Sequence, residues 1–121
     1  MPKISKEAAS QVESMEGFAG RYHDFGGCTV GFESYSQDFD GAEWFRGLPQ
    51  DRCQARHWGV VLKGKVGFRF ADHEEFIGAG EAYFVGPGHT PILFAGTEVV
   101  EFSPTDELAA TMSVVAKNIQ G

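Results

Sequence analysis

Three side chains that can bind a metal or exchange a proton lie close together in the sequence, at Asp51, Cys53 and His57. The segment 52–62 is predicted to be extended, and residues an even number apart point to one face of an extended segment. The spacing therefore predicts that the three side chains project together. Carboxylate, thiolate and imidazole each bind zinc, and imidazole also suits iron, copper or nickel, whereas the set offers too few oxygen ligands for calcium or magnesium.

Three further side chains are candidates for the same site. His89 follows the turn signal at 86–88 and supplies another metal ligand if its loop bends inward. Glu101 lies in the apolar run 99–102, where a buried carboxylate needs a partner or has a raised pKa, although alternation equally allows it on the outer face. Tyr83 is either a substrate-binding hydroxyl or a core aromatic residue with a solvated tip.

The same residues allow more than one kind of chemistry. His57 and Glu101 can act as acid and base without a metal, because an imidazole exchanges protons near neutral pH. Cys53 can contact a substrate, or act as a nucleophile with His57 as its base. Purely structural roles are also open: a small buried hydrophobe for Cys53, a hydrogen-bonded interior side chain for His57 and a turn cap for Asp51.

Short strands must position these residues. Sixteen of the 121 residues are glycine, about twice the average usage, which indicates many tight turns. Strand-like runs separated by turn signals recur along the chain, a pattern typical of a β-sandwich or barrel. Besides 52–62, the runs are 28–35, with Val30 and Phe32 on one face, 66–70, 75–77, 81–85, 92–94 and 98–102. The segment 37–50 is predicted to be a long loop whose Trp44 and Phe45 fold back onto the barrel.

The two ends of the chain have a helical pattern. Residues 1–20 carry apolar side chains at helical spacing, which predicts a short N-terminal helix or arm. Ser103-Pro104, as cap and first helical position, and the acidic residues that follow predict a C-terminal helix over 103–118. The barrel is then expected over 22–102, within a single domain that takes in all 121 residues.

Composition and charge argue against some classes of partner. The formal net charge is -7 and the sequence has no basic run, so nucleic acid and anionic membranes are disfavoured as partners. The first residues lack the apolar stretch of a signal peptide, and no apolar window is long enough to span a membrane. We expect a cytoplasmic protein in which Cys28 and Cys53 are reduced thiols.

Glycines in the second half of the chain have a recognisable spacing. Gly64, Gly80 and Gly88, with Pro87 beside Gly88, fit the two motifs of the cupin family, and the run 51–102 also resembles a group of small uncharacterised bacterial cupins. Cupins carry these motifs on adjacent strands, with metal ligands inside the barrel. The resemblance implies an all-β, cupin-type jelly-roll barrel with a C-terminal helix and a short N-terminal helix or arm.

The ligand positions of the two cupin motifs hold unusual residues in this chain. Counting back from the closing glycine of the first motif, its Glu position holds His57, and its His-x-His pair falls on Asp51 and Cys53. The final His position of the second motif holds Pro91, and His89 stands two residues earlier. The resemblance thus marks Asp51, Cys53 and His57 as metal-ligand positions.

The sequence leaves three functions open. The chain is a metal-dependent enzyme acting on a small organic molecule, a metal-free dehydratase or isomerase that uses His57 and Glu101, or a ligand-binding or sensory barrel without catalysis. Zinc, iron, nickel and copper are the candidate ions for the first, and the other two need no cofactor. A homodimer is expected from the family likeness, from the apolar face of the C-terminal helix and from Trp58, whose parity, opposite to that of His57, directs it outward.

Overall fold

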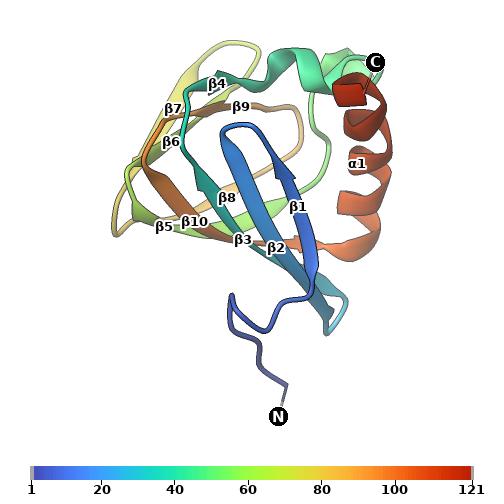
Figure 1. Cartoon of the computed structure of the whole chain (residues 1–121). Coiled ribbons are helices and arrows are strands. Elements are labelled where there is room, and N and C mark those ends of the chain that lie inside the picture. Colours follow the sequence, from blue (N-terminus) through green and yellow to red (C-terminus); the bar gives the residue numbers. More distant parts are fainter. Residues whose placement is uncertain (1, 121) are drawn as a thin grey trace.

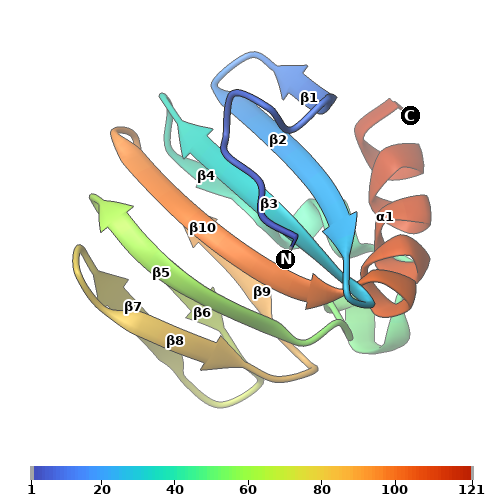
Figure 2. The same ribbon diagram turned by 90° about the horizontal axis from the view of Figure 1, so that it is seen from below.

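The computed structural model describes residues 2–120, which form two antiparallel sheets that face each other and a helix at one end of them (Figures 1 and 2). The six-stranded sheet has the order β1-β2-β3-β10-β5-β8, and the four-stranded sheet has the order β4-β9-β6-β7. The elements are β1 (Gln11–Met15), β2 (Phe18–Phe25), β3 (Cys28–Tyr35), β4 (Phe39–Asp40), the 3-10 helices η1 (Gly41–Phe45) and η2 (Pro49–Asp51), β5 (His57–Lys63), β6 (Lys65–Arg69), β7 (Glu74–Gly78), β8 (Ala82–Val85), β9 (Thr90–Leu93), β10 (Thr97–Pro104) and α1 (Thr105–Gln120).

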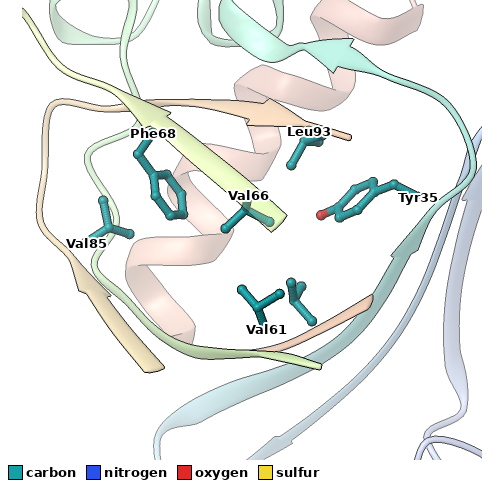
Figure 3. Close-up of a cluster of buried hydrophobic side chains, with 7 residues drawn as sticks. Tyr35, Val61, Val66, Phe68, Val85 and Leu93 are labelled. Carbon is teal, nitrogen blue, oxygen red and sulfur yellow. The ribbon is translucent and has the colours of Figure 1, made fainter. Parts of the chain in front are cut away.

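Apolar side chains pack together in the space between the sheets (Figure 3). They come from both sheets and point toward one another: Tyr35, Val61, Val66, Phe68, Val85, Leu93 and Val99. A second cluster, of Phe45, Cys53, Ala55 and Val115, lies where α1 packs against the loop segment 41–55. The predicted folding back of the loop is confirmed, because Phe45 is only 8% exposed and Trp44 packs against both clusters.

The N-terminal segment, predicted to be a short helix or an arm, contains a strand. Residues 11–15 form β1, which pairs with β2 from Gln11 opposite Tyr22 to Met15 opposite Phe18. Gly17 closes this hairpin with a φ of 85°, a left-handed conformation that favours glycine. The helical spacing was misleading because pairing with β2 decides the backbone conformation. The residues before β1 form an arm that crosses the outer face of the six-stranded sheet (Figure 2).

The C-terminal helix begins later than predicted. Its first residue is Thr105, because Ser103 and Pro104 still belong to β10, where they pair with Thr29 and Cys28 of β3. The Ser103 side chain therefore contacts the interior of the fold instead of capping the helix. Within residues 2–120, no helix is long and apolar enough to cross a membrane.

The outer face of β5, β8 and β10 carries a strip of exposed apolar side chains. Trp58 is 42% exposed, stands in register with Phe84 and Phe102, and has its ring centroid 5.1 Å from that of Phe84. The outward direction predicted for Trp58 is thus confirmed. The homodimer expected from the sequence stays a prediction.

One in-register row of residues crosses the opposite face of the same sheet, which looks toward the second sheet. The row runs Tyr22, Gly31, Glu101, Gly59, Tyr83 across β2, β3, β10, β5 and β8. A Cβ atom on Gly31 would lie 2.8 Å from the Tyr22 ring, and one on Gly59 would lie 2.4 Å from the Tyr83 ring. Only glycine therefore leaves room for each tyrosine ring to lie across the neighbouring strand.

We predict that Gly59→Ala destabilises the protein by about 1–3 kcal/mol, because the added methyl group displaces the Tyr83 ring. The matched control is Gly86→Ala, where the added Cβ would find no atom nearer than 3.8 Å. Urea unfolding of both variants measures the difference. Equal stabilities would show that the ring does not depend on the glycine.

Candidate metal centre and cavity

The space between the sheets contains a cavity of about 610 Å³, a size typical of small-molecule sites. Glu13 and Met15 of β1 and Met112 of α1 line it and are exposed, so its mouth lies between β1 and α1. Cys53, His57 and His89 also line the cavity and are buried. The cavity therefore connects its mouth with the three buried side chains that can bind a metal ion.

Cys53, His57 and His89 form a compact cluster. One potential ligand atom from each of the three lies within 4.8 Å of the other two, and Cys53 Sγ is 3.5 Å from His57 Nε2. His57 is the first residue of β5. Cys53 and His89 meet through an isolated β-bridge, in which Cys53 N donates to His89 O and Gly88 N donates to Cys53 O, each at 2.8 Å.

Hydrogen bonds to Nδ1 orient both imidazoles. His89 Nδ1 lies 2.6 Å from Gly86 O, and because a carbonyl only accepts, Nδ1 carries the proton and Nε2 keeps its lone pair. His57 Nδ1 lies 2.6 Å from Ser103 Oγ, which directs His57 Nε2 toward Cys53. Burial lowers the pKa of each histidine to about 4, so both are neutral at pH 7, the form that binds metal ions.

The three donors fit a first-row transition metal. In a tetrahedral zinc site the sulfur and nitrogen ligands lie about 3.5 Å apart, close to the separation of Cys53 Sγ and His57 Nε2. Burial raises the pKa of Cys53 to about 11, so the free thiol is protonated and an ion would bind with release of its proton. Because the cluster lines the cavity, a fourth position would be open to water or substrate.

Asp51 lies outside this cluster, and the prediction that it projects with Cys53 and His57 was wrong. The predicted common face required an extended segment, but residues 49–51 form η2 and Asp51 has a φ of 56°. Its side chain is exposed, and Oδ1 accepts a hydrogen bond from Gly47 N at 3.0 Å. Asp51 thus closes a turn of the loop, the structural role left open by the sequence.

Glu101 points inward, which decides between the two faces that alternation allowed. Oε2 accepts a hydrogen bond of 2.5 Å from the Tyr83 hydroxyl, and Oε1 lies 3.3 Å from His57 Nδ1. Burial raises the pKa of this carboxyl group to about 7. The structure therefore brings the predicted acid–base pair together, while Tyr83 contacts Glu101 and is not among the residues that line the cavity.

Glu33 of β3 is a second interior carboxyl group, and the sequence analysis missed it. Its two oxygens accept hydrogen bonds from the Tyr22 hydroxyl at 2.6 Å and the Tyr35 hydroxyl at 3.3 Å. Burial, together with the charge of Glu101, raises the pKa of Glu33 to about 7. The available signal was the two-residue spacing of Glu33 and Tyr35 from Gly31, which places the three on one face of the strand, opposite Val30 and Phe32.

Comparison with known proteins identifies the fold. Neither a protein-family model nor a curated protein matches the sequence. Among solved structures, an RmlC-like cupin from Shewanella frigidimarina matches with a TM-score of 0.58 at 14% identity, over 86% of this chain and 92% of that one. A cupin-2 domain containing protein from the same organism matches with a TM-score of 0.50 at 16% identity, over 70% and 78%.

The chain has the cupin fold. A structure of unknown function from Rhizobium leguminosarum is also similar, with a TM-score of 0.59 at 18% identity over 85% of this chain and 94% of that one. The jelly-roll architecture that the resemblance to cupins implies is therefore confirmed. At these identities the likeness establishes the fold alone.

The ligand positions of the cupin motifs can now be located in the barrel. Cys53 and His57, from the first motif, face the cavity, whereas Asp51 does not. In the second motif, the position of the final histidine holds Pro91, which lines the cavity but offers no donor. His89 replaces it as a potential ligand, because the β-bridge to Cys53 brings it to the cluster.

The raised pKa of Glu33 predicts a pH-dependent cost in stability. Its usual value is 4.5 and its value in the fold is about 7, so between these pH values the folded state binds more protons than the unfolded state. Stability contributed by this group is then lost as the pH rises through that window. Glu33→Gln removes the effect, so the free energy of unfolding of the variant relative to the parent should rise by about 3 kcal/mol between pH 4.5 and 7.

Urea unfolding at several pH values tests this prediction, and the matched control is Glu16→Gln in the exposed β1–β2 turn. The interior histidines and Glu101 titrate in the same range and are present in all three proteins, so the difference reports the Glu33 carboxyl group together with its charge interactions with His57 and Glu101. A difference between Glu33→Gln and the parent that stays constant with pH would contradict the prediction.

Proposed function

We propose that this cupin barrel binds one transition-metal ion through Cys53, His57 and His89 and acts as an enzyme on a small organic molecule in the adjoining cavity. The observation that carries the proposal is the convergence of three buried donors on the wall of a cavity that opens to the surface. Zinc, iron, nickel or copper suits the thiolate and imidazole donors. A bound ion of this class would supply a Lewis acid that polarises a substrate oxygen.

The chain's own residues have separate roles in this proposal. Ser103 and the carbonyl of Gly86 hold the two imidazoles in position through their Nδ1 atoms. One carboxyl oxygen of Glu101 lies next to His57, and the other accepts a hydrogen bond from the Tyr83 hydroxyl. Glu101 can therefore hold or deliver a proton at the cavity wall. Aromatic side chains line the cavity and would pack against a bound molecule.

We predict that the protein, purified without added metal and then incubated with a transition-metal salt, retains about one equivalent of the metal. Cys53→Ser and His89→Ala should reduce the metal content to background, because each substitution removes a ligand. The matched control is Cys28→Ser, which changes the other cysteine, at the start of β3 and away from the cluster. Elemental analysis after gel filtration gives the result. Equal metal content in Cys53→Ser and Cys28→Ser would contradict the proposed site.

Ser103 allows a second test, which asks whether its hydrogen bond to His57 orients that imidazole for metal binding. Ser103→Ala removes the nearest partner of His57 Nδ1 and leaves Glu101 Oε1 at 3.3 Å, and loss of such an orienting partner typically lowers metal affinity about 10–100-fold. Competition with a chelator of known affinity measures the change. Ser113→Ala, on the exposed surface of α1, is the control, and equal affinities of the two variants would remove Ser103 from this role.

A second candidate function is supported by the 3.3 Å approach of His57 Nδ1 to Glu101 Oε1. The pair could transfer protons in a dehydration or isomerisation without a metal. Protein that retains turnover after complete removal of metal, and loses it in Glu101→Gln, would favour this alternative. Metal uptake and ligand binding with no turnover of any bound compound would instead favour a sensory barrel.

A further inference from the structure

The charges that face the cavity are of one sign. Its lining includes the carboxyl groups of Glu13, Asp24, Glu33 and Glu101. Among residues 2–120, no lysine or arginine lines the cavity. Arg56 and Arg69 have partners elsewhere, in Glu107 and Asp40 respectively. The interior therefore offers no protein cation to a bound molecule.

This distribution of charge discriminates between classes of ligand. A carboxylate or phosphate inside the barrel would be desolvated next to Glu33 and Glu101 with no lysine or arginine to pair with it, which is costly. A cation would be desolvated among carboxyl oxygens and aromatic faces, both of which attract it. The aromatic lining residues are Phe18, Tyr22, Tyr35, Trp44, Phe45 and Phe68.

A metal ion at the proposed site does not reverse this preference. A divalent ion bound to the Cys53 thiolate would retain a single net positive charge, and Glu101, 3.3 Å from His57, would offset it. Glu33 belongs to a different strand and contacts Tyr22 and Tyr35, outside the cluster of metal donors. It is therefore the carboxyl group available to pair with a ligand.

We infer that the molecule taken up by this cavity is an organic cation, an amine or a quaternary ammonium compound, and that Glu33 is the residue that binds its positive group. The two tyrosine hydroxyls fix the Glu33 carboxylate in position, and the rings of Phe18 and Tyr35, with centroids 5.5 Å apart, lie at the same end of the cavity. The inference rests on the proposed function only in taking this cavity as the ligand site. It requires neither a metal nor a particular reaction.

A matched series of three probes tests the charge preference: choline, its uncharged isostere in which a tert-butyl group replaces the trimethylammonium group, and the carboxylate of that same carbon skeleton. Calorimetric titration of the full chain is expected to show choline binding at least about ten-fold more tightly than the uncharged isostere, with the carboxylate weakest. Glu33→Gln should bring the affinities for choline and the isostere to within about two-fold of each other.

Glu16→Gln is the control, because it makes the same change in net charge in an exposed turn and should leave the preference intact. Titrations with and without a chelator separate this inference from the metal proposal, since loss of the metal leaves Glu33 in place. The inference is overturned if choline does not bind, if the carboxylate binds as well as choline, or if Glu33→Gln keeps the preference of the parent.

Discussion

The interior carboxyl groups are the constraint around which the six-stranded sheet is built. A carboxyl group removed from water needs hydrogen-bond donors. Here tyrosine hydroxyls supply them, to Glu33 from the neighbouring strand β2 and to Glu101 from β8, on the far side of β5. Each tyrosine can reach its carboxyl group only by laying its ring across the adjacent strand, which requires Gly31 and Gly59 at the crossing points. The glycines, tyrosines and carboxyl groups are thus parts of a single arrangement, and the cavity keeps its polar wall because all of them are present.

This arrangement changes the usual relation between polarity and burial. On β5 and β10 the side chains that face outward include Trp58, Leu62 and Phe102, while His57 and Glu101 face inward. Polar and apolar groups share the interior, because Tyr35, Val66, Phe68, Leu93 and Val99 of the apolar cluster also line the cavity. The structure therefore gives up apolar burial inside in order to hold polar groups in a defined geometry, as functional sites commonly do.

Sequence reasoning predicted the fold and most of the site, and its errors have physical causes. Turn chemistry is local, so glycine spacing located the strands, and His57, Cys53 and Glu101 were identified as interior candidates. Glu33 was missed because alternation separates the two faces of a strand without saying which is inside, and in β3 the polar face is the inner one. Asp51 was misplaced because parity holds only within extended backbone, and a 3-10 helix precedes Cys53.

The position of Cys53 depends on two contacts that no local pattern could reveal. Residues 54–56 belong to no strand, yet Cys53 is fixed on one side by its backbone bridge to His89 and on the other by α1, whose Val115 packs against it. Contacts hold both ends of the helix. Near its start, Glu107 accepts a hydrogen bond from Arg56 Nε, and near its end, Asn118 Nδ2 donates to the backbone carbonyls of Trp44 and Arg46. Because α1 both backs the metal cluster and lines the mouth of the cavity, a shift of this helix would alter the donor geometry and the entrance together. The C-terminal helix therefore belongs to the site as much as the barrel does.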